Sequence, residues 1–137
     1  MHILIVDDFA ASAEVLGELL SDLGHTTNVA YSGTQALQAM RDQPPDLALL
    51  DINLPDLDGW QVAEALRADG SECYVVAMTA ANVPTYVARS ARSGCDRHVT
   101  KPVTPADLEL LIKSAELRRS GQMPRRRTGA ALRPATP

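Results

Sequence analysis

The chain has 137 residues and a net charge of −4, and 45% of its residues are hydrophobic. This length supports one domain with a core and is too short for two ordinary domains. No apolar run is long enough to span a bilayer, and the first residues lack a charged leader with a small-residue cleavage site, so we expect a cytoplasmic protein without membrane contact. Cys73 and Cys95 lack metal-ligand spacing, which favours buried thiols over a disulfide or a zinc site.

Charge is distributed unevenly along the chain. All 17 acidic residues precede position 118, whereas six of the 13 basic residues stand at or after it, so the body carries −10 and the tail +6. An acidic body argues against a nucleic-acid surface on the domain itself. The tail is rich in Arg, Pro, Gly and Ala and has too little apolar surface to order itself. We therefore predict one domain over residues 1–117 and a basic, Pro/Arg-rich disordered tail over residues 118–137.

The first strand and helix are marked by a change of hydrophobic period. Residues 3–6 form an apolar run, β-branched at three of four positions, which predicts a strand ending in Asp7 and Asp8. From Phe9 the apolar residues recur at helical spacing, which predicts a helix that stops at Gly24. The stripe that we expect this helix to bury consists of Val15, Leu16, Leu19, Leu20 and Leu23.

The middle of the chain repeats the alternation of strand and helix. Residues 26–30 predict a weak strand, and residues 33–43 predict a helix that two prolines end. Residues 47–50 are a short apolar run between proline-containing segments, which predicts a strand buried on both faces, and Asp51 follows it. A further helix is expected over residues 58–68.

The last third contains two more strands and two more helices. Residues 74–78 predict a buried strand that ends in Thr79, and residues 83–94 a weakly determined helix. A short strand at residues 97–99 leads to Lys101.

The final helix has the strongest start signal in the chain. Thr104 is the expected N-cap, Pro105 takes the first helical position, and Asp107 is the acid three residues after the cap. Five strands thus alternate with five helices, which predicts an α/β fold: a flavodoxin-like, doubly wound parallel sheet with strand order 2-1-3-4-5. Right-handed crossovers place the carboxyl end of every strand on one edge.

Polar side chains from four strand ends converge on that edge. The first and third strands are neighbours in this order, so Asp7, Asp8 and Asp51 should lie within contact distance, near Thr79 and Lys101. Ionised carboxylates at contact repel by on the order of 4 kcal/mol per pair, so the cluster favours a cation. Oxygen ligands without nearby Cys or His favour Mg²⁺ over zinc.

These groups are the parts required for phosphoryl transfer to an aspartate. Asp51 would be the nucleophile, while the metal and Lys101 neutralise charge on the transferring group and Thr79 donates a hydrogen bond to it. Taken singly, each residue has an ordinary interpretation: a turn-capping aspartate, a surface lysine, a strand-end threonine. Their joint placement at successive strand ends favours the functional interpretation.

The same residues resemble the receiver domain of two-component response regulators. The matching segments are residues 3–8 (ILIVDD), 49–59 (LLDINLPDLDG), 78–80 (MTA) and 100–102 (TKP). The resemblance implies that Asp51 accepts a phosphoryl group from a sensor histidine kinase or a histidine phosphotransfer protein, and that Thr79 and Lys101 bind the phosphate. It also implies a cis Lys101–Pro102 bond. The implied Mg²⁺ ligands are Asp8, Asp51 and the backbone carbonyl of Asn53, with Asp7 in the outer shell.

One position departs from the family pattern. Response regulators usually have Tyr or Phe three residues before the lysine, where this chain has His98. In the family this ring turns inward as the threonine moves onto the phosphate, so Thr79 and His98 are the expected switch pair. The implied output is binding of an unidentified downstream protein, or a homodimer through the fourth helix, fifth strand and fifth helix. Such a domain catalyses only its own phosphotransfer and dephosphorylation.

Alternative functions differ at single positions. Residues 94–103 are similar to receivers of hybrid histidine kinases, which leaves a phosphorelay module or a fragment of such a kinase as an alternative. A haloacid-dehalogenase-type phosphatase carries a second Asp two positions after the nucleophile, where this chain has Asn53. A flavodoxin-like mononucleotide binder needs a Ser/Thr/Gly loop after the first strand, where Asp7-Asp8-Phe9 stands. The complete acidic set also argues against a non-phosphorylated scaffold.

Overall fold

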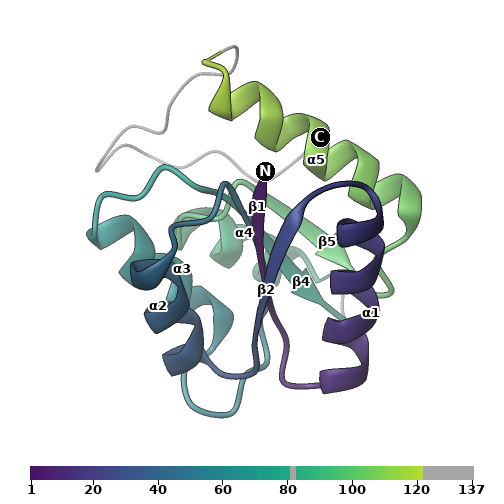
Figure 1. Ribbon diagram of the computed structural model, residues 1–137. Helices are drawn as coiled ribbons and strands as arrows, with labels where there is room; N and C mark the ends of the chain where they lie inside the picture. The colour runs from purple at the N-terminus through teal and green to yellow at the C-terminus, as the bar shows by residue number, and fades with distance from the viewer. Residues whose placement is uncertain (81–82, 122–137) are drawn as a thin grey trace.

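The computed structural model describes residues 1–80 and 83–121, in which five strands alternate with five helices (Figure 1). This alternation confirms the predicted elements. Their bounds are β1 (His2–Val6), α1 (Ala10–Asp22), β2 (Thr26–Ala30), α2 (Gly33–Asp42), β3 (Leu47–Asp51), α3 (Gly59–Ala68), β4 (Tyr74–Thr79), α4 (Pro84–Arg92), β5 (Arg97–Thr100) and α5 (Pro105–Arg119).

The five strands form one parallel sheet in the order β2-β1-β3-β4-β5. This order confirms the predicted flavodoxin-like fold. β3 lies at the centre, and all five of its residues are buried, which is why its sequence is continuously apolar instead of alternating. The order of the strands reverses between β1 and β3, and the carboxyl ends beside such a switch point are where open α/β sheets bind ligands.

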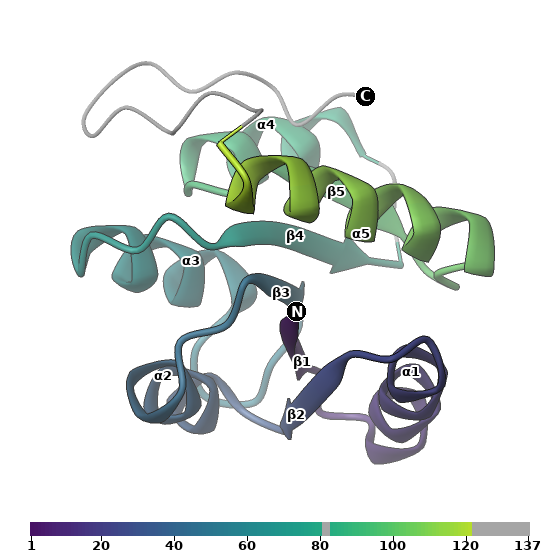
Figure 2. The ribbon, with the colours of Figure 1, turned by 45° about the horizontal axis from the view of Figure 1, so that its top comes forward.

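Helices cover both faces of the sheet (Figure 2). α1 and α5 lie on one face, and α2 and α3 lie on the other, while α4 packs beside β5. Side chains of β1 alternate between the two cores: Ile3 and Ile5 join the cluster under α1 and α5, and Leu4 and Val6 join the cluster under α2 and α3. The site-bearing strands are therefore held from both sides.

The buried side of α1 differs from the predicted stripe. It consists of Ala13, Leu16, Gly17 and Leu20. The prediction is wrong for Val15, Leu19 and Leu23, which are 56%, 40% and 58% exposed. The physical reason is close packing of small residues: a Cβ at Gly17 would already lie 3.7 Å from the Cδ1 atom of Ile5, at ordinary contact distance. The apolar residues of α1 are spread over a broad part of the helix surface, and the side that carries the small residues Ala13 and Gly17 faces the sheet.

The start of α5 follows its predicted signal, but the end lies beyond the predicted boundary. The Thr104 hydroxyl accepts from the backbone N–H of Asp107 (3.1 Å), and the Asp107 carboxylate accepts from that of Thr104 (2.9 Å), which is a capping box. Arg118 and Arg119, expected in the tail, form the last turn of α5. Residues 122–137, the rest of the predicted tail, lie outside the described residues.

A buried ion cluster explains why the helix continues past residue 117. The Asp96 carboxylate accepts hydrogen bonds from the guanidinium groups of Arg67 and Arg118, each at 2.9 Å, and from the backbone N–H of Val75 at 2.9 Å. Only 4% of the Asp96 side chain is exposed, and the two arginines provide the positive charge that a buried carboxylate requires. This cluster joins α3, β4 and α5 at the edge of the sheet opposite the acidic cluster.

Both cysteines are buried free thiols, as predicted. Burial raises the pKa of Cys73 to about 12, so its thiol stays protonated. Across the described part of the chain, none of the helices combines the length and the apolar character needed to cross a membrane.

A leucine pair tests the assignment of the core. Leu49 is fully buried in β3, so Leu49→Ala should lower the free energy of unfolding by about 3 kcal/mol through lost burial and a cavity. The same substitution at the exposed Leu23 should change it by less than about 0.5 kcal/mol. Urea denaturation of the two variants measures both values, and equal losses would contradict the assignment.

Candidate functional site

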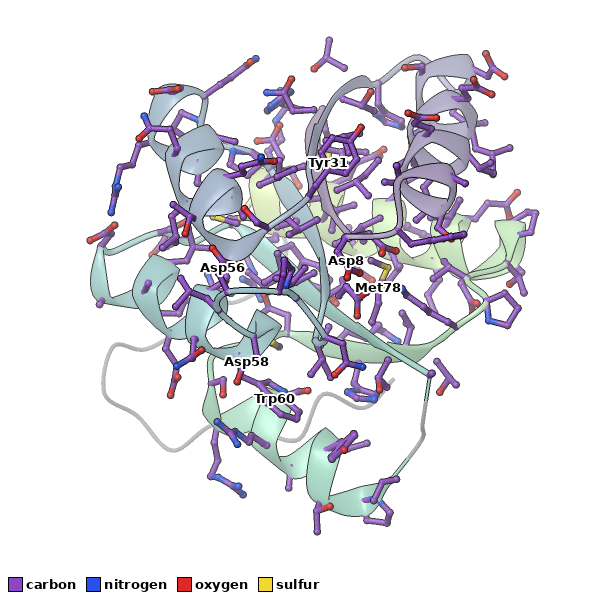
Figure 3. All side chains as sticks on the ribbon, turned by 90° about the horizontal axis from the view of Figure 1, so that it is seen from below. Asp8, Tyr31, Asp56, Asp58, Trp60 and Met78 are labelled. Carbon is purple, nitrogen blue, oxygen red and sulfur yellow. The ribbon has the colours of Figure 1, made fainter. Side chains whose placement is uncertain are left out.

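An acidic cluster stands at the carboxyl edge of the sheet, which Figure 3 views face on. Asp7 and Asp8 follow β1 and Asp51 ends β3, and one carboxylate oxygen from each lies within 4.8 Å of the others. Asp7 and Asp51 are 0% and 5% exposed, whereas Asp8 is exposed. The three predicted carboxylates therefore share one site, with one of them open to solvent.

Lys101 crosses to this cluster from the loop after β5. Its Nζ atom donates to the Asp7 carboxylate at 2.8 Å and to the Asp51 carboxylate at 2.9 Å. The peptide bond to Pro102 is cis, as predicted. Thr79 ends the neighbouring β4 and is 1% exposed. Asp7, Asp8, Asp51, Thr79 and Lys101 thus all stand at the same edge of the sheet.

Charge in the cluster is unbalanced. Three carboxylates face one ammonium group, so the net charge is −2 when all are ionised. Burial, together with the charge of Asp7, raises the pKa of Asp51 above its ordinary value, although hydrogen bonds from Lys101 and Asn53 oppose this. Burial also disfavours the charged form of Lys101, but its hydrogen bonds to Asp7 and Asp51 outweigh this and raise its pKa. The lysine stays charged, and the cluster favours a further cation.

Backbone groups hold the two buried carboxylates in place. Asp51 Oδ1 accepts from the N–H of Asn53, and Asp7 Oδ1 accepts from the N–H of Phe9, each at 3.0 Å. The second oxygen of each carboxylate accepts from Lys101. Gly59 closes the loop tightly, since a Cβ there would lie only 2.5 Å from the backbone oxygen of Asp51. Both side chains are thus oriented before any ligand binds.

The donor set fits Mg²⁺. Carboxylate oxygens are the ligands that Mg²⁺ prefers, and no histidine or cysteine belongs to the group within residues 1–80 and 83–121. A divalent cation would cancel the charge of −2, and the exposure of Asp8 leaves room for water or phosphate oxygens beside it. The fit rests on the chemistry and the charge of these residues.

His98 lies in a hydrogen-bonded group that the sequence analysis missed. Its Nδ1 atom is 3.0 Å from the Ser90 hydroxyl, which also accepts from Trp60 Nε1 at 2.9 Å. The Trp60 ring meets Tyr86 edge to face at 5.3 Å, and the Arg89 guanidinium lies 4.5 Å from its centroid. Figure 3 shows Trp60 directed from the start of α3 toward α4. This Trp60–Ser90–His98 network joins α3, α4 and β5.

His98 lies close to Thr79 in the sheet. His98 pairs with Ala77 in the register of β4 and β5, two residues before Thr79. Burial lowers its pKa, and its Nε2 atom is buried without a hydrogen-bond partner in the described part of the molecule. Burial thus favours the neutral form of the imidazole in the folded protein. Of this group, the sequence analysis singled out His98, whereas it gave no signal for Trp60 or Ser90.

The chain matches a known protein family and several characterised relatives. The family model for the response regulator receiver domain matches residues 3–113. The chain belongs to the response regulator receiver-domain family. This receiver domain is 42% identical over 123 residues to the DNA-binding response regulator MtrA of Mycobacterium tuberculosis strain H37Rv, with 90% of this chain and 53% of MtrA covered. The same identity holds for MtrA of Mycobacterium leprae, with 54% of that protein covered.

Solved structures support the same assignment. A two-component response regulator from Clostridium difficile gives a TM-score of 0.82 at 28% identity, covering 87% of this chain and 98% of that one. A CheY-like receiver domain protein from Methanospirillum hungatei gives 0.82 at 26%, covering 88% and 97%. These matches confirm the resemblance, the fold and a place in two-component signalling, so the phosphatase and flavodoxin-like alternatives are set aside.

The receiver domain accounts for only part of its curated relatives. The chain spans about half the length of the MtrA proteins that it matches. Those relatives are DNA-binding by name, so the expectation that this chain does not bind nucleic acid stays a prediction. The residue roles inside the site also stay predictions.

The neutral imidazole of His98 predicts an acid-sensitive contribution to stability. The pKa of His98 is lowered in the fold, so the unfolded chain binds this proton at higher pH, and stability should fall as pH drops below about 6.5. We expect wild type to lose more stability than His98→Phe between about pH 7.5 and 5.5. Urea midpoints measure this, and the two proteins should change equally between about pH 7.5 and 8.5. Equal losses on acidification would contradict the prediction.

Proposed function

We propose that Asp51 accepts a phosphoryl group from a phosphohistidine and that this modification changes what the receiver domain binds. The observation that supports this most directly is Lys101, bonded to both Asp7 and Asp51 at an acidic, partly open edge of the sheet. The donor is a sensor histidine kinase or a histidine phosphotransfer protein, in keeping with the family. The chain acts as a phosphorylated switch and modifies only itself.

The chemical step is a substitution at phosphorus. A carboxylate oxygen of Asp51 forms a bond to phosphorus while the phosphorus–nitrogen bond of the phosphohistidine breaks, and its electron pair returns to the imidazole. The product on this chain is an acyl phosphate. Asp51 is suited to this role because hydrogen bonds hold both of its oxygens, and it lies beside the solvent-exposed Asp8.

Lys101 and Thr79 act on the charge that moves. The ammonium group of Lys101 already lies 2.9 Å from Asp51, so it neutralises charge on the phosphoryl oxygens without travelling far. The Thr79 hydroxyl, at the end of the adjacent strand, donates a hydrogen bond to one of those oxygens. Asp8, Asp51 and the Asn53 carbonyl, with Asp7 in the outer shell, would hold Mg²⁺, which would supply the remaining positive charge.

The phosphoryl group would change the balance between two conformations. It adds a charge of about −2 at a buried position and draws Lys101 and Thr79 toward it. Thr79 and His98 are two residues apart in the register of adjacent strands, so movement at Thr79 reaches the Trp60–Ser90–His98 network. The output is binding of a downstream protein or a homodimer through α4, β5 and α5.

Phosphorylation itself can be tested with a small donor. Wild type incubated with acetyl phosphate and Mg²⁺ should gain one phosphoryl group in its intact mass, and Asp51→Ala should gain none, because the nucleophile is missing. Asp69→Ala removes an exposed carboxylate from the C-terminal end of α3 and should be phosphorylated like wild type. Incorporation that survives Asp51→Ala would contradict the proposal.

The switch can be followed through Trp60, the single tryptophan of the chain. Beryllofluoride with Mg²⁺ mimics the phosphoryl group, and we expect it to change the emission of Trp60 in wild type by disturbing the contact to Ser90. His98→Ala should still bind beryllofluoride, seen in the ¹⁹F spectrum, but with a clearly smaller emission change. A full emission change in His98→Ala would remove His98 from the switch.

A further inference from the structure

The loop between β3 and α3 is attached to helix α2 through one side chain. Asp56 Oδ1 accepts from the backbone N–H of Gly33 at 2.7 Å and from that of Leu57 at 2.7 Å. Asp56 Oδ2 accepts from the backbone N–H of Thr34 at 2.9 Å and from the Thr34 hydroxyl. Figure 3 shows Asp56 beside α2 and Asp58 at the start of α3. A single carboxylate thus joins the loop to α2, whose Gly33 and Thr34 lie 23 and 22 residues before Asp56 in the sequence.

This carboxylate completes the cap of α2. The first N–H groups of a helix have no partner within it, and Ser32, the residue before α2, serves only Gln35, at 3.1 Å. Asp56 serves the two N–H groups that remain in the first turn, those of Gly33 and Thr34. The hydrogen bonds from Thr34, with those from Leu57 and Gly33, hold the pKa of Asp56 well below its usual range, so it stays ionised at the positive end of the helix.

Packing at Gly33 is a second, independent sign that the loop and the helix are built to fit. A Cβ at Gly33 would lie 2.6 Å from Leu57 Cβ and 3.1 Å from the Leu57 backbone oxygen. The backbone of α2 therefore rests directly on the loop, with no room for a side chain. At its base the loop is closed by a 2.9 Å hydrogen bond from Gly59 N–H to the Ile52 oxygen.

We propose that Asp56 is a positioning residue for the phosphorylation site. It contacts neither the phosphoryl group nor the metal, and it acts by fixing the loop that carries Asn53. Only Leu54 and Pro55 separate Asn53 from Asp56. Because the ring of Pro55 fixes its φ angle, this short segment is stiff, and a shift of Asp56 also moves Asn53. Asn53 is the residue whose N–H orients Asp51 and whose carbonyl is the proposed third Mg²⁺ ligand. The inference rests on the proposed function.

Magnesium dependence separates positioning from general stability. For Asp56→Ala, the Mg²⁺ concentration that gives half-maximal phosphorylation by acetyl phosphate should rise about tenfold, the lower end for an outer-shell partner. The rate at saturating Mg²⁺ should stay within about twofold, because binding then restores the loop. Ser32→Ala is the matched control: it removes a cap hydrogen bond that stays within the first turn of α2, and its Mg²⁺ dependence should match wild type.

Two further variants protect the test against misfolding. Asp56→Asn keeps one acceptor oxygen and should give an intermediate Mg²⁺ dependence, while Gly33→Ala should raise the half-saturating concentration by pushing Leu57 away. Folding of each variant is verified by its amide spectrum, in which the Asn53 and Leu54 signals also report Mg²⁺ directly. An unchanged Mg²⁺ dependence in folded Asp56→Ala would overturn the positioning role of Asp56 but leave the proposed function standing. Absence of Mg²⁺-dependent phosphorylation in wild type overturns the proposed function instead.

Discussion

The pair of hydrogen bonds from Lys101 to Asp7 and Asp51 is the constraint on which the site depends. It joins the loop after β5 to the ends of β1 and β3, and it leaves two buried carboxylates with a single counter-charge. Burial of unpaired charge is costly, and each oxygen of the two buried carboxylates has a donor, either Lys101 or a backbone N–H. The remaining negative charge of the cluster favours binding of a divalent cation. Such a cation and Lys101 would together provide the positive charge that phosphoryl transfer requires.

The fold brings these residues together and connects them to the surface helices. Reversal of strand order between β1 and β3 brings the acidic residues together, and the buried β3 gives Asp51 a rigid base. On one side, Asp56 attaches the loop after Asp51 to α2. On the other, the Trp60–Ser90–His98 network attaches β5 to α3 and α4. A change at the acidic cluster can therefore reach the surface helices through either of these two attachments.

Local signals in the sequence predicted the fold and the central residues. Continuous apolar runs indicated buried parallel strands, Thr104 and Asp107 marked the start of α5, and the strand-end residues predicted the acidic cluster with Lys101. The buried side of α1 was not predictable, because spacing alone does not show which side of a broad apolar surface meets the sheet. Nor were the cap from Asp56, the Asp96 ion cluster or the role of Ser90, since each pairs residues distant in sequence and ordinary in type.

Phosphorylation of this receiver domain is proposed to form an acyl phosphate on Asp51. Borohydride reduces an acyl phosphate of aspartate to homoserine, which marks the modified position permanently. After phosphorylation of the full chain by a phosphohistidine donor, reduction and peptide mass analysis should find homoserine at position 51 and aspartate at positions 7 and 8. Homoserine at position 7 or 8 instead, or no homoserine in a chain that carries phosphate, would contradict the account.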